Sequence, residues 1–508
     1  MKKFAFLFIM VTSVAIVNAQ DITDALRYSS DELSGSARVR SMSGAFGALG
    51  GDISSITINP AGSAVMLTSE AGLTIGNYNT QNENTFFGNN TSDTKDQFDL
   101  SQAGVVLVYN NTDQNAKWGR MSLGFNYENS NNYSNRNFIK GLNTNNGIDK
   151  YFLAYAQGVS LENIDLLPNE TVDDLYQWLG ENYGFAEQQA FLGYQAYIID
   201  PVSSDNLNSD YNSNAYYTGL DQEYTLETKG ANRKFTVNFA TEYDKKLYLG
   251  INLNFHSIDL KKETYLSEIG FDADSPLQET GFKNYLETYG NGFSLQAGAI
   301  YKATKNLRLG AVYQSPTWYR INEELSQGVF GISIDENGNE YSPDVVYPNV
   351  TNIYEAYKLT TPGKFTGSLS YVFGKAGLLS FDYIRKDYSN TKFRPVNDAY
   401  FSTQNNQISN SLQATNSYRL GGEARIERLS LRAGYRFEES PYKNESTVGD
   451  LTGYSFGFGY NFGATTLDLS YDIAEQDSNY QLYSVGLTDS AAVNSKFQTI
   501  MLSLNFKI

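Results

Sequence analysis

Apolar and polar residues alternate along most of this chain, and the alternation restricts the folds open to it. In residues 246–256 the apolar side chains fall at every second position, as in a strand with one apolar face. The same period appears in fourteen segments: 71–80, 98–109, 117–129, 233–243, 246–261, 290–302, 306–317, 363–374, 377–388, 415–426, 428–440, 450–462, 465–475 and 496–508. Period two predicts β-strands throughout.

These segments are long for strands. Ordinary strands have about 5–6 residues, whereas many of these have about 12. Twelve residues at ~3.3 Å each, tilted by ~40°, rise about 30 Å, which is enough to cross an apolar layer ~25 Å thick. Tyrosines stand near many segment ends, including Tyr109, Tyr243 and Tyr301. Such rings suit a bilayer interface.

Short and long connections alternate strictly between the segments. The long ones are 81–97, 130–232, 262–289, 318–362, 389–414, 441–449 and 476–495. This is the pattern of a transmembrane barrel with short periplasmic turns and longer outer loops. A soluble β-sandwich would have shorter strands and no such alternation of loops. We therefore predict an all-β, 14-stranded antiparallel transmembrane β-barrel over residues 71–508.

The N-terminus has the features of a secretory leader. Lys2 and Lys3 precede an apolar run to Val17, and a small residue, Ala19, stands before Gln20. We expect a signal peptide over residues 1–19. Nothing after it approaches the ~20 apolar residues of a membrane helix. The expected location is the bacterial outer membrane.

Composition excludes several classes of function. The formal charge of −18 argues against nucleic acid as a partner, because phosphate is repelled. There is no cysteine and one histidine, His256, so thiolate or zinc chemistry, haem binding and a Cys nucleophile have no support. We expect no catalytic residues, no metal and no cofactor. A hydrolase built on His256, Ser257 and Asp259 is the enzymatic alternative.

Residues 20–70 are rich in glycine and alanine, and a fourteen-stranded barrel left open would leak. We expect this segment to be a hatch inside the lumen. Small residues let its backbone pass close to the wall, and Asn59 can cap a helix whose first residue is Pro60. The hatch residues singled out are Gly44, Gly47, Gly50, Gly51, Asn59, Pro60 and Gly62.

Residues 36–65, "SARVRSMSGAFGALGGDISSITINPAGSAV", resemble the N-terminal hatch of the FadL-like outer-membrane hydrophobic-compound transporters in their Bacteroidetes-type form. Residues 307–319, 359–390 and 418–442 are also similar to that family. The resemblance implies passive uptake of long-chain fatty acids or aromatic hydrocarbons. It further implies that a hatch shift, in which the glycine and Asn-Pro positions would act, releases the ligand sideways into the bilayer.

The connection 130–232 departs from the family pattern and contains a helical stretch around residues 171–201. Leu175, Trp178, Leu179 and Tyr183 are spaced as on one helix face. They could contact ligand or form the core of a packed lid. As a hypothesis for ligand capture we single out Trp178, Tyr183, Trp318 and Tyr319. The expected partners are hydrophobic small molecules and outer-membrane lipid.

A second function from another class is docking. The plugged barrel would then be an accessory subunit of an outer-membrane assembly or secretion complex, and the 130–232 loop would bind other outer-membrane proteins.

Overall fold

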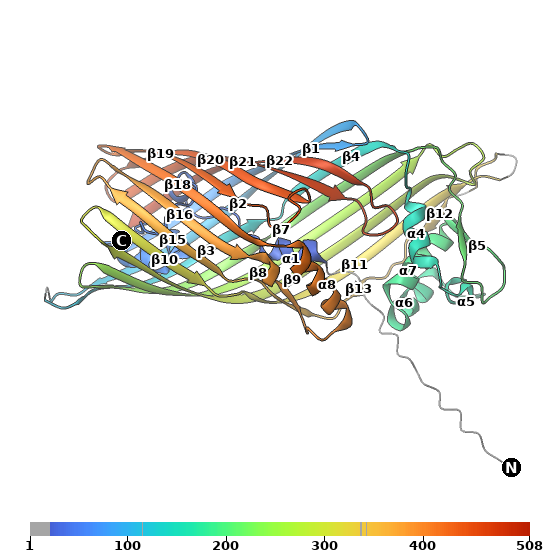
Figure 1. Ribbon diagram of the computed structural model, residues 1–508, viewed down its shortest axis with the longest axis horizontal. Coiled ribbons are helices and arrows are strands. Elements are labelled where there is room, and N and C mark those ends of the chain that lie inside the picture. The colour runs from blue at the N-terminus through green and yellow to red at the C-terminus, as the bar shows by residue number, and fades with distance from the viewer. Residues whose placement is uncertain (1–20, 114, 336–337, 342) are drawn as a thin grey trace, which may run out of the picture.

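The computed structural model describes residues 21–113, 115–335, 338–341 and 343–508. Figure 1 shows one long barrel, with the C-terminus at one end and helices α4 to α7 at the other. The expected signal peptide, residues 1–19, lies outside the described residues. Within the described ranges, no helix is long and apolar enough to cross a membrane.

Fourteen strands form the wall in the described part of the chain. They are β1 (Glu70–Phe86), β2 (Asn89–Asn110), β3 (Trp118–Asn132), β7 (Leu220–Tyr243), β8 (Leu247–Ile269), β9 (Leu277–Lys302), β10 (Leu307–Gln314), β15 (Lys364–Val372), β16 (Gly377–Asp387), β18 (Ala414–Ile426), β19 (Leu429–Glu438), β20 (Val448–Asn461), β21 (Thr465–Gln481) and β22 (Ser490–Lys507). Each pairs antiparallel with the next, and β22 pairs with β1 from Glu70–Lys507 to Thr85–Ala492. The predicted fourteen-stranded closed barrel is confirmed. Closure leaves no open sheet edge in lipid.

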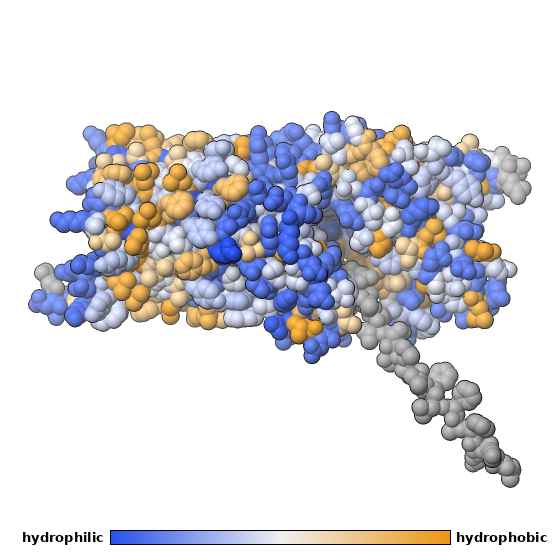
Figure 2. Space-filling model, in the orientation of Figure 1, coloured by the Kyte–Doolittle hydropathy of each residue, from blue (hydrophilic) through white to orange (hydrophobic). Residues whose placement is uncertain are grey.

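The alternation places apolar side chains outside and polar ones inside. On β8, Ile251 and Phe255 are about half exposed, whereas Asn252 and Asn254 are buried in the lumen. Figure 2 shows hydrophobic side chains gathered over the half of the barrel that carries the C-terminus. This belt is the surface that faces the membrane.

The strands continue well past the predicted segments. β8 has 23 residues and β9 has 26, so residues 262–289, expected to be a loop, are mostly strand. Beyond the belt their outward side chains are charged, and Lys261 pairs with Glu287. Their lumen-facing side chains there include the buried apolar residues Leu260, Leu266 and Phe282. The apolar face therefore changes from the outside to the inside of the wall, and for this reason the predicted segments ended too early.

Some strands of the wall are interrupted and resume in line. β4 (Asn135–Asn143) continues β3 along β7, while β11 (Trp318–Ser333) continues β10 along β9. The remaining short strands are β12 (Asp344–Val346), β13 (Asn352–Ile353), β14 (Tyr357–Thr360) and β17 (Lys392–Arg394). Pro316 and Pro362 occupy two of the breaks, because proline supplies no N–H to a ladder.

The predicted helical loop is confirmed. Residues 144–219, which we call the lid, contain α4 (Ile148–Ala156), α5 (Leu161–Ile164), α6 (Val172–Asn182), α7 (Phe185–Gln195), β5 (Ile199–Pro201) and β6 (Tyr211–Ser213). Its apolar residues form one core with Phe282 and Val329 of the wall, so the lid packs onto the outer end of the barrel. A further helix, α8 (Ala399–Ser411), and the short helix η2 (Tyr388–Asn390) lie in a separate loop.

Residues 21–69, which we call the hatch, lie inside the barrel (Figure 1). They form α1 (Ile22–Ser29), α2 (Ala37–Arg40), α3 (Ser55–Ile58) and the 3₁₀ helix η1 (Pro60–Val65). Nearly every residue from 35 to 66 is buried. The part of the hatch from α2 to η1 therefore fills the lumen at membrane level, and α1 packs above that part in an apolar cluster with Tyr133 and Tyr319.

Candidate functional site

Glycines bring the hatch backbone against the wall. A Cβ on Gly47 would lie 2.0 Å from the Oγ of Ser368, and one on wall residue Gly310 would lie 2.3 Å from the Gly47 carbonyl oxygen. Gly44 has φ +76° and packs against Arg419. Of the other hatch positions singled out from the sequence, Gly50, Gly51 and Gly62 meet one another inside the hatch, where the Gly51 N–H donates to the Gly62 carbonyl.

Asn59 and Pro60 join the hatch to itself and to the wall. The Asn59 side chain accepts the Ala61 N–H at 3.0 Å and so caps η1, with Pro60 in the first turn, as the sequence suggests. Its Nδ2 donates to the carbonyls of Gly47 (2.6 Å) and Ala299 of β9 (3.1 Å). Gly47 and Asn59 are thus in contact, as are Gly50, Gly51 and Gly62, whereas Gly44 packs on the wall at Arg419.

Ion pairs anchor the hatch on the opposite side. Arg40 of α2 makes a two-pronged contact with Asp472 of β21, at 2.8 and 3.0 Å, and both side chains are buried. Arg38 reaches Glu423 of β18 at 3.0 Å, and Glu423 also accepts from Arg432 of β19. Planar guanidinium–carboxylate pairs fix geometry as well as charge.

A wall carboxylate also holds the hatch backbone. Oδ2 of Asp382 on β16 accepts the N–H groups of Phe46 and Gly47, at 3.0 and 2.9 Å. Sequence reasoning missed these wall anchors. One signal in the sequence could have found them. Each is a charged residue at a lumen-facing position of a strand whose other lumen-facing residues are mostly polar but uncharged.

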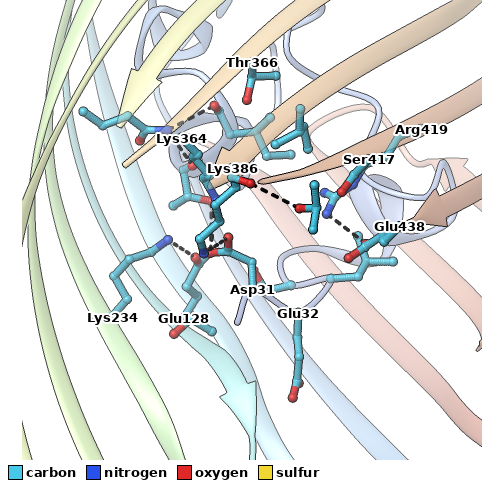
Figure 3. A pocket seen from close by; sticks show the side chains of 18 of the residues that line it. Asp31, Glu32, Glu128, Lys234, Lys364, Thr366, Lys386, Ser417, Arg419 and Glu438 are labelled. Atoms are coloured by element: carbon cyan, nitrogen blue, oxygen red, sulfur yellow. Dashed lines mark hydrogen bonds and ion pairs between the residues drawn. The ribbon is translucent and has the colours of Figure 1, made fainter. Parts of the chain in front are cut away.

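Two cavities lie above the hatch. The larger, of about 480 Å³, runs from α1 and Arg40 to the inner faces of β19 through β22. The smaller, of about 90 Å³, is charged and is drawn in Figure 3. They meet at Asp31, Glu32 and Glu438, which line both.

Asp31 is the centre of charge in the smaller cavity. It pairs with Lys386 at 2.7 Å and with Lys364 at 3.2 Å. Burial opposes its ionisation, but the two lysines outweigh burial and hold the pKa of Asp31 well below its usual range. Next to it, burial raises the pKa of Glu32 to about 7, although this carboxylate faces the open space of the cavity.

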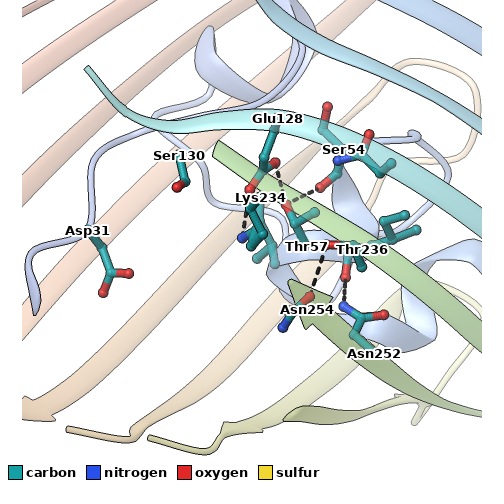
Figure 4. A network of polar contacts seen from close by, with 12 residues as sticks. Asp31, Ser54, Thr57, Glu128, Ser130, Lys234, Thr236, Asn252 and Asn254 are labelled. Carbon is teal, nitrogen blue, oxygen red and sulfur yellow. Dashed lines mark hydrogen bonds and ion pairs between the residues drawn. The ribbon is translucent and has the colours of Figure 1, made fainter. Parts of the chain in front are cut away.

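A polar network forms the floor between hatch and wall (Figure 4). Glu128 of β3 pairs with Lys234 of β7 at 2.6 Å and accepts the hydroxyl of Thr57 of the hatch at 3.0 Å. Beside it, Thr236 donates to Asn254 at 2.9 Å. Polar pairs of this kind fill the lumen at hatch level, so it is no passage for an apolar molecule while the hatch is seated.

Near the larger cavity the backbone ladder between β2 and β3 is broken. Pairing between β2 and β3 stops at Gln102–Glu128. Beyond that point side chains bridge β2 to β3 and β4, through Asp99–Asn129 and Asp93–Arg136, each at 3.0 Å. The larger cavity reaches the inner side of this break, because Asn132 and Asn135 line it.

The four aromatic residues singled out for ligand capture are not brought together. Trp178 and Tyr183 pack on each other, at 5.3 Å between ring centres, on the exposed surface of the lid. Trp318 points outward from the wall, whereas Tyr319 is buried in the lumen and accepts from Asn232 at 3.0 Å. Only Tyr319 lies in the lumen wall, close to α1.

His256 has no hydrolase partners among the described residues. It is buried in the lumen, with Nε2 3.1 Å from the Ser294 hydroxyl, whereas Asp259 pairs with Arg233 on the other face of the sheet. The part of the chain that the structure describes contains no group of three or more His, Cys, Asp or Glu able to hold a metal ion.

A closed barrel with an apolar belt, a polar lumen and an internal plug defines an outer-membrane β-barrel protein. The chain matches the family described as outer membrane protein transport protein (OMPP1/FadL/TodX) over residues 199–507, more than half of its length, and it belongs to that family. It is thus a transport protein of the outer membrane, not an enzyme.

Solved structures share the fold. The toluene transporter TodX of Pseudomonas putida is 13% identical, with a TM-score of 0.51 over 94% of this chain and 100% of that one. A FadL homologue from Pseudomonas aeruginosa is 12% identical, with a TM-score of 0.51 over 94% and 99%. No curated protein sequence matches the chain.

Proposed function

We propose that this protein takes up small hydrophobic molecules passively across the outer membrane. The observation that carries the proposal is a cavity of about 480 Å³ above a seated hatch, reaching a break in the barrel wall. Its size falls in the range of ligand sites, about 300–1,000 Å³. One solved structure with this fold is described as a toluene transporter, which favours an apolar cargo.

The route follows from the free-energy cost of exposing an apolar molecule to water. An apolar solute gains ~0.8 kcal/mol for each methylene it buries, so an aqueous pore is a poor path. In the proposed mechanism the ligand enters past the lid and rests in the larger cavity. A shift of the hatch then lets it leave sideways between β2 and β3–β4, where side chains alone close the wall.

Crosslinking the break tests this route. The chain has no native cysteine, so Asp93→Cys/Arg136→Cys places one reactive pair across the break. We expect a short bis-maleimide to reduce uptake of labelled oleate or toluene by at least about fivefold, because it fixes β2 to β4. Uptake by cells with and without the gene gives the baseline.

The matched control is Lys261→Cys/Glu287→Cys, whose residues are directly paired across the intact β8–β9 ladder. The same reagent should leave its uptake unchanged. Equal uptake with and without the gene would contradict transport and favour the docking role, with the lid as the surface for other outer-membrane proteins.

A further inference from the structure

An aromatic row crosses the outward face of the wall near the outer edge of the apolar belt. Phe235 of β7, Phe255 of β8, Phe293 of β9 and Trp318 of β11 are paired in register, each strand with the next. Phe235, Phe255 and Trp318 are about half exposed. Aromatic side chains gather where a barrel wall passes from the hydrocarbon layer to the headgroups. Positions just beyond Trp318 on the same face therefore lie at headgroup level.

Three cations stand side by side just beyond Trp318. Arg320 lies two positions further out on β11, about 7 Å along the strand, and it points outward between the buried residues Tyr319 and Ile321. Arg320 is paired in register with Lys358 of β14, which in turn is paired with Arg394 of β17. All three are exposed, and neighbouring strands are about 5 Å apart. We call these three residues the basic row.

The protein supplies no negative charge to the basic row. Among the described residues, none of the three forms an ion pair, and their only side-chain hydrogen bond runs from Arg394 Nε to Thr360 Oγ1 at 3.2 Å. Like charges placed directly opposite on neighbouring strands destabilise a sheet. The row therefore lowers stability unless an anion from outside the chain neutralises it.

Other outward cations of the wall have acidic partners. Three such pairs are Lys140–Glu223 at 2.7 Å, Lys261–Glu287 at 3.2 Å and Lys283–Glu263 at 2.6 Å. Glu324, two outward positions beyond Arg320 on β11, accepts the hydroxyl of Tyr289 at 3.0 Å. The chain as a whole carries a formal charge of −18. Three neighbouring cations without an acid are thus a local feature of this face, not a consequence of composition.

We propose that the basic row binds the phosphate groups of an outer-leaflet lipid, whose acyl chains lie on Trp318 and Phe293. A guanidinium binds phosphate through two parallel hydrogen bonds, and the ammonium of Lys358 adds a point charge. A lipid fits this surface better than an acidic protein does, because the cations adjoin the apolar belt and one lipid contacts both. The site lies on the outside of the wall and is independent of the cargo and route proposed above.

Native mass spectrometry of the purified full chain in a nonionic detergent tests the assignment. The probes are diphosphoryl lipid A and the same lipid with both phosphates removed, with inorganic phosphate as a competitor. We expect the wild type to bind the diphosphoryl form at least about tenfold more tightly, and added NaCl to reduce this preference. Arg320→Gln/Lys358→Gln/Arg394→Gln should abolish the preference and leave binding of the dephosphorylated lipid unchanged. Arg320→Lys/Arg394→Lys should retain part of it.

The matched control is Lys140→Gln/Lys261→Gln/Lys283→Gln, which removes the same charge from outward lysines that have acidic partners. It should keep the wild-type preference, and an equal loss in this control would overturn the inference, because net charge alone would then set the binding. Equal wild-type binding of the two lipids would overturn it without any variant.

Two further results would replace the lipid by another ligand. Displacement of the lipid by an equal concentration of inorganic phosphate would show a site for a free anion. Full retention of the lipid preference in the basic-row variant, with loss of an acidic protein that copurifies with the wild type, would show a protein partner. Either result would overturn the assignment.

Discussion

At the scale of single residues, close approach and buried charge decide how the hatch sits. Gly47 is in contact with Ser368 of β15 and Gly310 of β10, and its N–H is held by Asp382. Gly51 has φ +74°, but a Cβ added there would meet no atom within 4 Å. One glycine is therefore required for space and the other for backbone conformation.

Gly47→Ala tests the space requirement. The added methyl group meets Ser368, and overpacking of this kind costs about 1–3 kcal/mol. We expect a lower unfolding temperature and a measurable ion leak in planar bilayers. Gly47→Ala/Ser368→Gly should recover part of both, whereas Gly51→Ala should cost about 1–2 kcal/mol of strain without the leak. A Gly47→Ala protein as tight as wild type would show that the hatch does not need this contact.

At the scale of elements, the hatch is held by α2 and η1 on different sides of the barrel. α2 is fixed to β18 and β21 by ion pairs, while η1 rests on β8 and β9 through backbone contacts and Asn59. The wall is interrupted where β2 leaves β3. A movement of the hatch toward or away from this break has to release either the ion pairs of α2 or the contacts that η1 makes with β8 and β9.

Arg40→Met tests the α2 anchor. It leaves Asp472 buried without its partner, a change that costs about 3–5 kcal/mol, whereas replacing both members with apolar residues is often neutral. We expect Arg40→Met to raise single-channel conductance and sensitivity to large antibiotics. Arg40→Met/Asp472→Leu should restore both toward wild type. If the double variant leaks as much as the single one, the charge pair itself, rather than packing, seats the hatch.

At the scale of the whole molecule, the barrel closes without help from the hatch. Fourteen strands pair around a full circuit, and their apolar belt faces outward. The hatch, the lid and the loop that carries α8 occupy the space inside and at the outer end. The barrel and the hatch are joined by many polar contacts, but the described part of the hatch contributes no strand to the wall.

Deletion of residues 21–66 should therefore leave a folded barrel. We expect heat-modifiable migration on gels to persist, and the conductance to rise to that of an open pore, because a fourteen-stranded barrel is too wide for side chains alone to fill. Loss of the compact form on deletion would mean that the hatch is needed to fold the wall.

The sequence alone determined the strands of the wall and the local turns of the hatch. Period-two hydropathy is set by neighbouring residues, so the strand number, the polar lumen and the outward belt could be predicted. Asn59 and Pro60 gave the start of η1 for the same local reason. The strand extensions beyond the belt were missed, because there the apolar side chains, such as Leu260 and Leu266, lie on the lumen face and the outward face is polar.

Only the tertiary structure decided which lumen residues meet. Arg38 finds Glu423 across 385 positions, and Arg419 faces Arg436 only in one register of β18 against β19. Barrel tilt and stagger fix these encounters, and they leave no periodic trace in the sequence. For the same reason the four aromatic residues chosen from the sequence lie apart. The two cavities and the break beside β2 are likewise apparent only in the fold.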